Sequence, residues 1–186
     1  ANGVGVLHPH GALATDPPGL VVCDVDSTVT RTEAIDLLAE CAGKADEIRG
    51  ITARAMAGEL DFTQSLYARV RCLEGLHIGA LEEAWKATVI TPGTAELVAA
   101  AHEVGAAVGL VSGGFTALVD PLAEQIGADF AASHELEIVD DHLTGRVVGD
   151  IIDRAAKATW LRRWASERGV ALERTIALGD GANDLD

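Results

Sequence analysis

The sequence predicts an α/β protein in which a doubly wound parallel sheet carries an inserted helical cap. Short apolar strands alternate with helical segments after residue 90, an order typical of βαβ units and a parallel sheet. An apolar run, 19–23, is rich in valine and follows Pro17 and Pro18, which favours a buried strand. Several helical segments come directly after this strand, and they indicate a small subdomain that closes over a ligand and excludes water.

These observations divide the chain into three predicted parts. Residues 1–18 mix glycine, histidine and proline without sustained periodicity and are expected to form a linker or tail. Residues 19–33 and 90–186 make up the expected core, and residues 34–89 make up the expected cap. Because the last motif of the core reaches almost to Asp186, we expect a longer protein in which further elements cover the sheet.

The boundaries of the expected elements follow from hydrophobic periodicity and from the positions of glycine and proline. The cap is expected to contain four helices, at about 34–43, 45–57, 61–74 and 78–88. The core is expected to contain helices at about 93–101, 115–126 and 153–169, and strands at about 106–111, from 129 onward and at 174–178. A β-hairpin is expected between residues 134 and 148, with Asp140 and Asp141 between its strands.

Composition and charge exclude several classes of protein. The 186 residues are 48% hydrophobic and 23% charged, as in a globular protein with a substantial core. The formal net charge of −15 would repel a phosphate backbone, so we do not expect nucleic acid as a partner. No apolar run reaches the roughly 18 residues that span a bilayer, and no secretory signal is visible, so we expect a cytoplasmic protein without membrane contact. The sequence leaves open whether two copies of the protein form a homodimer.

The apolar strand ends in two carboxylates, Asp24 and Asp26, separated by Val25. Side chains alternate along an extended chain, so both can point to one side, and parallel sheets bind ligands at this carboxyl edge. Two acids there suggest a metal ion, a nucleophile or both. The same spacing occurs in sugar-nucleotide enzymes, in Ca²⁺ loops and in plain turns, so this stretch alone leaves those alternatives open.

Three further stretches follow in a definite order: 111–114 after the second strand, Lys157 in a later helix, and 179–184 after the last strand. Ser112 can donate its hydroxyl to a phosphoryl oxygen, and the two glycines after it are expected in a turn whose amides no Cβ obstructs. That combination would make a phosphate cradle. Taken alone, however, Ser-Gly-Gly is an ordinary turn and Lys157 a solvated helix residue.

Together these motifs resemble the haloacid dehalogenase superfamily, in which Asp-x-Asp-x-Thr, Ser or Thr, Lys and paired acids occur in this order. Within it, the sequence is more similar to the phosphoserine phosphatase family, at 24–28, Glu33, 61–70, 111–115 and 179–184. The resemblance implies a Rossmann-like core and Mg²⁺-dependent hydrolysis of O-phospho-L-serine to L-serine and phosphate. This reaction passes through an aspartyl-phosphate and is the last step of serine biosynthesis.

The resemblance assigns the catalytic work to three residues. Asp24 would be the nucleophile and Asp26 the general acid and base. Lys157 would offset the repulsion among the carboxylates and hold Asp24 against the phosphoryl group. Mg²⁺ would be held by the Asp24 carboxylate, the Asp26 backbone carbonyl and the Asp180 carboxylate. Asp184 would act indirectly, by helping to hold a metal-bound water or Lys157.

The same resemblance divides substrate binding between two groups of residues. The phosphate would be held by Ser112, Gly113 and Asn183. The amino acid part would be recognised by the cap: Glu33 matches the position that binds the amino group, and Arg69 matches the residue that binds the carboxylate. Phe62 would form an apolar wall over both.

Two other functions stay open on the sequence. One is a phosphatase of the same superfamily that acts on another small phosphomonoester, such as phosphohomoserine. The other is an inactive truncated or regulatory fragment that keeps the fold and binds phosphate or a partner without turnover. The full set of acids, serine and lysine argues against an inactive fragment. The position of Asp186, just inside the final motif, argues for one.

Overall fold

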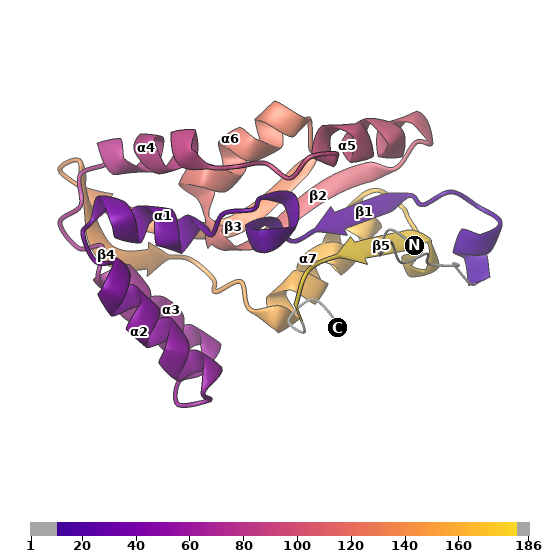
Figure 1. Cartoon of the computed structure of the whole chain (residues 1–186). Helices are drawn as coiled ribbons and strands as arrows, with labels where there is room; N and C mark the ends of the chain where they lie inside the picture. The colour runs from indigo at the N-terminus through magenta and orange to yellow at the C-terminus, as the bar shows by residue number, and fades with distance from the viewer. Residues whose placement is uncertain (1–10, 182–186) are drawn as a thin grey trace, which may run out of the picture.

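The structure, a computed structural model, describes residues 11–181, and these form a five-stranded sheet with helices on both faces (Figure 1). The strands are β1 (Leu20–Cys23), β2 (Ala107–Phe115), β3 (Phe130–Val139), β4 (His142–Val148) and β5 (Thr175–Leu178), in the order β4-β3-β2-β1-β5. β1 pairs in parallel with β2 and β5, and β2 pairs in parallel with β3, whereas β4 is antiparallel to β3. The predicted α/β class with a mainly parallel sheet is confirmed.

Seven α-helices accompany the sheet in the described part of the chain. They are α1 (Ala34–Cys41), α2 (Ala45–Met56), α3 (Phe62–Arg71), α4 (Gly79–Ala87), α5 (Thr94–Glu103), α6 (Thr116–Ile126) and α7 (Arg154–Glu167). Short 3-10 turns lie at Gly11–Ala14 and Leu172–Arg174, and an irregular turn lies at Val25–Val29. Among the residues that the structure describes, none of these helices combines the length and the apolar character that a bilayer crossing would need.

Alternate residues of β1 are buried on opposite faces of the sheet, which is why the fold requires helices on both sides. Val21 and Cys23 pack with apolar residues of α5 and α6. Leu20 and Val22 pack with α7 on the other face. All four side chains are less than 5% exposed, so β1 forms the centre of the core and its carboxyl end is held rigidly.

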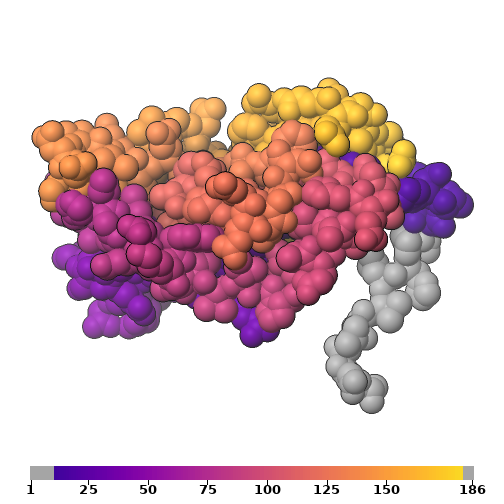
Figure 2. Space-filling model, turned by 90° about the horizontal axis from the view of Figure 1, so that it is seen from above, coloured from indigo at the N-terminus to yellow at the C-terminus, as the bar shows by residue number. Residues whose placement is uncertain are grey.

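The expected cap is built in two layers. α4 lies beside α6 and α1 packs against α4, whereas α2 and α3 project from the sheet as a helical hairpin (Figure 1). One apolar cluster joins these helices to the sheet through Leu38, Ile48, Leu66, Phe115 and Leu143. Figure 2 shows the cap helices and the β3–β4 hairpin together at one end of the molecule. The exact division of the chain into core and cap stays a prediction, because both share this cluster.

The structure corrects the prediction of a turn over residues 112–114. β2 was expected to end at residue 111, but it continues as far as Phe115. Its pairing with β3 shifts register between Val111 and Phe115, so the Ser-Gly-Gly stretch is an irregular part of the strand. Val111 and Phe115 on either side of this segment are both paired with β3, at Ala132 and His134, and these flanking pairs keep the segment within the strand.

The expected strand after residue 129 and the first strand of the expected hairpin are one continuous strand, β3. The chain reverses at Asp140 and Asp141, whose φ angles are 50° and 60°, and returns as β4. Two successive positive φ angles are typical of the tight two-residue turns that match the twist of a hairpin. The predicted hairpin and its turn residues are therefore confirmed.

Candidate active site

Asp24 stands at the carboxyl end of β1, directly after the four buried apolar residues of that strand. Its backbone N–H donates to the carbonyl of Leu178 in β5 (2.8 Å), so the chain is still held in the sheet at this point. The residue as a whole is only 7% exposed. Asp180 follows the end of β5 and lines the same cleft. The parallel register thus brings these two carboxylates to one edge of the sheet.

The turn Val25–Val29 reverses the chain so that Asp26 also faces this edge. Its geometry is not helical throughout, because Asp26 is extended (ψ 130°) and Ser27 has a φ of 59°. Asp26 Oδ1 accepts a hydrogen bond from the backbone N–H of Ala34 (3.0 Å), the first residue of α1. The Asp26 carboxylate therefore satisfies one of the otherwise unpartnered amides at a helix N-terminus. The sequence analysis missed this contact.

Lys157 reaches the same place from the other face of the sheet. Its Nζ lies 2.6 Å from Asp24 Oδ1, and the two side chains are 10% and 8% exposed. α7 begins just before this lysine, and the side chain of Asp153 accepts from the N–H of Ala156 (2.8 Å) and so caps the helix. The Lys157 ammonium is therefore presented from the first turns of a capped helix, which limits its freedom of movement.

The proton affinity of Asp26 departs clearly from its usual value. The pKa of Asp26 is raised to about 7, mainly by burial and also by the neighbouring carboxylates of Glu33 and Asp24, against the opposing effects of the Ala34 amide and Lys157. A carboxyl group with this pKa exchanges its proton near neutral pH, which suits a general acid that must later act as a base.

The Ser-Gly-Gly segment of β2 lies opposite Asp26. Gly113 and Gly114 line the cleft, whereas Ser112 is fully buried and its Oγ accepts from the N–H of Gly114 (2.8 Å). A Cβ on Gly114 would lie 2.9 Å from Asp26 Oδ2, closer than real Cβ atoms approach other atoms, and 3.0 Å from Ser112 Oγ, which is tighter than most such contacts. The absence of a side chain at this position is therefore what allows Asp26 and Ser112 to share one small space.

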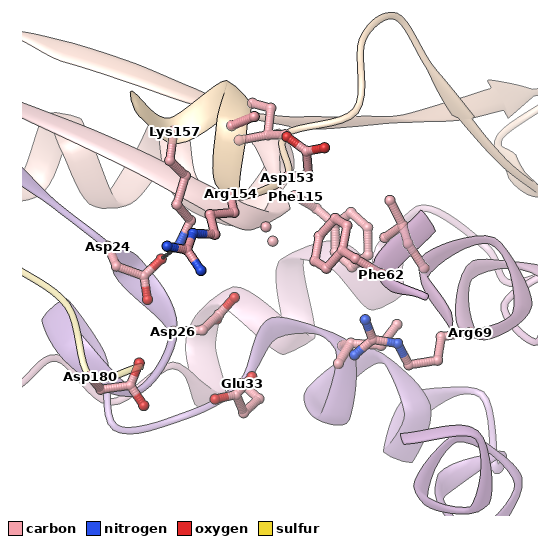
Figure 3. Close-up of a pocket in the computed structure, with 16 residues that line it drawn as sticks. Asp24, Asp26, Glu33, Phe62, Arg69, Phe115, Asp153, Arg154, Lys157 and Asp180 are labelled. Atoms are coloured by element: carbon pink, nitrogen blue, oxygen red, sulfur yellow. Dashed lines mark hydrogen bonds and ion pairs between the residues drawn. The ribbon is translucent and has the colours of Figure 1, made fainter. Parts of the chain in front are cut away.

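The cap supplies the other wall of the cleft, which has a volume of about 700 Å³ (Figure 3). α3 contributes Phe62, which is 42% exposed, and Arg69, whose Nε donates to the carbonyl of Ser65 (3.3 Å). Glu33 precedes α1 and accepts from the hydroxyl of Ser27. Burial lowers the pKa of Arg69, and the carboxylates of Glu33, Asp36 and Asp26 oppose that shift.

The structure adds a residue that the sequence analysis did not identify. Arg154, the first residue of α7, lines the cleft and extends into it beside Lys157 (Figure 3). A signal for it is present in the sequence, because residues three apart on a helix share a face and Arg154 lies three residues before Lys157. Asn183 and Asp184, which the resemblance assigned to phosphate binding and to indirect metal support, lie outside the described residues.

The donors at the sheet edge are suited to a hard cation. Asp24, Asp26 and Asp180 line one cleft with oxygen donors, the chemistry that Mg²⁺ prefers. Within residues 11–181 no three carboxylate, histidine or cysteine side chains are grouped closely enough to hold a metal ion by themselves. The expected set of two carboxylates and one backbone carbonyl, with substrate and water in the other positions, stays a prediction.

The chain is similar to known proteins over its whole length. The family model of the haloacid dehalogenase-like hydrolases matches residues 21–186. A phosphoserine phosphatase of Streptomyces coelicolor is 53% identical over 186 residues, which are all of this chain and 45% of that protein. The phosphoserine phosphatase of Streptococcus thermophilus is 48% identical over 90% of this chain and 78% of its own length.

The fold is also shared with solved structures. A substrate-bound complex of phosphoserine phosphatase matches with a TM-score of 0.85 at 39% identity, over 91% of this chain and 81% of that one. Relative to the Streptomyces coelicolor protein, this chain spans less than half of the length. The similarity covers every element that contributes to the cleft.

Proposed function

The chain belongs to the haloacid dehalogenase-like hydrolase family, and we propose that it is the catalytic region of a phosphoserine phosphatase. The observation that carries this proposal is the contact between Lys157 and Asp24 on the floor of a cleft whose opposite wall holds Glu33 and Arg69. One end of the cleft suits a phosphoryl group, and the other end offers one negative and one positive side chain. O-phospho-L-serine carries the matching groups: a phosphate, an ammonium and a carboxylate.

Asp24 is the proposed nucleophile. One of its carboxylate oxygens attacks phosphorus, the bond between phosphorus and the seryl oxygen breaks, and an aspartyl-phosphate forms. Lys157 holds the Asp24 carboxylate in place and offsets the negative charge that gathers around it. Because both side chains are nearly buried, the attraction between them acts in a poorly screened environment.

Asp26 moves the protons in both steps. It gives its proton to the seryl oxygen as serine leaves, and the resulting carboxylate then takes a proton from the water that attacks phosphorus. This second step breaks the bond to Asp24, releases phosphate and restores both acids to their starting states. The pKa of about 7 allows Asp26 to be protonated when the substrate arrives and to be a base afterwards.

The proposed metal ion is Mg²⁺, held by the carboxylates of Asp24 and Asp180 and by the backbone carbonyl of Asp26. When bound, it would neutralise the charge of the phosphoryl oxygens and favour their alignment with the nucleophile. Ser112 and the Gly113 amide would hold the remaining phosphoryl oxygens, and Arg154 would add a second cation near Lys157. Cations are needed here, since the described acids of the cleft would otherwise repel a dianionic substrate.

Substrate choice is proposed to lie in the cap. Arg69 would form two parallel hydrogen bonds with the substrate carboxylate, and Glu33 would accept from its ammonium. Phe62 would cover the carbon chain between them. We further propose that the protein acts in the cytoplasm and that a homodimer, if formed, leaves the mouth of the cleft open to a small substrate.

Steady-state kinetics on a panel of phosphomonoesters with Mg²⁺ tests the proposal. We expect phosphoserine to have the highest kcat/KM, and we expect analogues that lack the amino or the carboxylate group to lose about 10²-fold or more. Equal rates on all of them would favour the broader phosphatase that acts on other small phosphomonoesters. An Asp24→Asn variant with the activity of the original protein would refute the role of Asp24 as nucleophile. If neither the original protein nor this variant releases phosphate, the inactive regulatory fragment is favoured.

A further inference from the structure

His134 is a buried titratable residue that the proposed mechanism does not use. It lies in β3, and its side chain is completely buried. A buried imidazole requires hydrogen-bond partners for both ring nitrogens, and His134 has them. Nδ1 lies 3.0 Å from the carbonyl oxygen of Gly113, and Nε2 lies 2.8 Å from the backbone nitrogen of Ile152.

These two partners determine the state of the ring. The N–H of Ile152 can only donate, so Nε2 of His134 must accept and carries no proton. The carbonyl of Gly113 can only accept, so Nδ1 must carry the proton and donate. The imidazole is thus neutral and held in one tautomer. Burial also lowers the pKa of His134, in agreement with a neutral ring.

The bond to Gly113 acts on the phosphate side of the cleft. The carbonyl of Gly113 and the N–H of Gly114 belong to one planar peptide unit, so fixing the first orients the second. That N–H donates to Ser112 Oγ (2.8 Å). One peptide is therefore held at both ends, by His134 and by Ser112. Because Ser112 Oγ accepts this bond, its own proton is directed elsewhere, and the substrate phosphoryl group is the proposed acceptor.

The bond to Ile152 acts on the lysine side of the cleft. Ile152 is followed by Asp153, the capping residue of α7, and the N–H of Lys157 donates to the carbonyl of Asp153 (2.9 Å). The chain between β4 and α7 is otherwise irregular, so a hydrogen bond to a side chain in the sheet sets where the helix begins. The Phe62 ring of the cap also lies near the imidazole, with centroids 6.3 Å apart.

From this arrangement we propose that His134 is a positioning residue, whose neutral imidazole couples the Ser-Gly-Gly segment to the start of α7 and so aligns Ser112 and Lys157 on one phosphoryl group. His134 is fully buried and is not among the described residues that line the cleft. The expected effect of His134 on kcat rests on the proposed phosphatase function. Its two hydrogen bonds, and the link that they make between β2 and the start of α7, do not.

Three substitutions separate the two hydrogen bonds. His134→Asn places an amide N–H near the position of Nδ1 and can keep the bond to Gly113. His134→Gln reaches further and can place a carbonyl near the position of Nε2, which keeps the bond to Ile152. His134→Leu keeps neither. We expect kcat for phosphoserine to fall by about 10²-fold in the leucine variant, with a much smaller change in KM, because a small displacement of reacting groups has effects of this size. The His134→Asn and His134→Gln variants should each have a kcat at least about tenfold higher than that of His134→Leu.

Ile126→Ala provides the control for a general loss of stability. Ile126 is a buried core residue at the end of α6, outside the cleft, and its truncation should lower Tm without changing kcat at temperatures where the protein is folded. A leucine variant with kcat within about twofold of the original would overturn the proposal. So would equal losses of kcat in all three His134 variants, since neither hydrogen bond would then matter.

A second measurement does not depend on activity. Nitrogen NMR of the intact protein should show His134 with a protonated Nδ1 and an unprotonated Nε2, and the amide signals of Gly114 and Ile152 should shift in the leucine variant. The opposite tautomer, or unchanged amide signals, would refute the arrangement. If these signals behave as expected while no phosphoester is hydrolysed, the proposed function fails and the coupling by His134 stands.

Discussion

The backbone N–H of Ala34 donates to the carboxylate of Asp26 over 3.0 Å, and this one hydrogen bond joins the turn after β1 to the first helix of the cap. It stabilises the ionised form of Asp26, whereas burial and the nearby carboxylates stabilise the protonated form. The balance leaves Asp26 with a pKa near neutrality. The position of α1 is therefore linked to the acid strength of a proposed catalytic residue.

We expect Asp26→Asn to remain folded, because its amide oxygen can still accept from Ala34. Turnover of phosphoserine should fall by about 10²- to 10⁴-fold, since the seryl oxygen then leaves without a proton. A phosphoester with an acidic phenol as leaving group needs no such proton, so formation of its aspartyl-phosphate should be much less affected. Burst kinetics with both substrates measure this step, and equal losses with the two would contradict the role of Asp26 as an acid.

The buried pair of Lys157 and Asp24 should contribute to stability as well as to catalysis. Lys157→Met leaves the Asp24 carboxylate buried without this ammonium, so we expect the free energy of unfolding to fall by about 3 kcal/mol. The double variant with Asp24→Asn should recover much of the loss, because the buried charge is then gone. Urea unfolding measures both. As a control, Lys44→Met breaks the exposed pair with Glu47 and should change stability by less than about 1 kcal/mol.

Gly114→Ala tests the crowding between β2 and the turn after β1. The new Cβ would lie 2.9 Å from Asp26 Oδ2, so the carboxylate has to move, and we expect kcat to fall by at least about tenfold. Gly50→Ala is the matched control, because Gly50 lies in α2 with nothing within 4 Å of a Cβ. It should keep full activity and stabilise the helix by about 0.5–1 kcal/mol. An active Gly114→Ala enzyme would show that Asp26 does not need its present position.

Arg154 should matter for the affinity of the substrate more than for the chemical step. Removing its charge with Arg154→Gln weakens the attraction for a dianion, and we expect KM for phosphoserine to rise by about tenfold, equivalent to about 1.4 kcal/mol. Arg163→Gln removes an exposed arginine of the same helix that lies over Trp160, and it should leave KM unchanged. Identical kinetic constants for the two variants would exclude a contact between Arg154 and the phosphate.

His134 also makes stability depend on pH. Its pKa in the folded protein is lowered from the usual 6.5, first by burial and then by the charge of Arg69, while its bonds to the backbone oppose the shift. The unfolded chain therefore takes up a proton more readily, and stability is lost as pH falls below about 6.5. Thermal unfolding between pH 8 and 5 should show a larger fall in Tm for the original protein than for His134→Asn, which has no titrating group there. Parallel curves would contradict this.

The sequence by itself determined the class of fold and pointed to most of the residues that are proposed to carry the chemistry. Alternating buried residues in β1 require helices on both faces, and the end of that strand places Asp24 at the edge where Asp180 also arrives. Patterns of this kind are local, because side-chain alternation and the ends of helices depend on neighbouring residues. For that reason the hairpin at Asp140 and Asp141 was also predictable.

Only the tertiary structure decided which of these side chains meet. Lys157 is 133 residues from Asp24 in sequence, and an isolated helical lysine carries no sign of its partner. The amide of Ala34 on Asp26 and the imidazole of His134 between Gly113 and Ile152 are contacts of the same kind. They form because buried polar groups must find partners in whichever segment the packing brings close, and that choice is made by the whole fold.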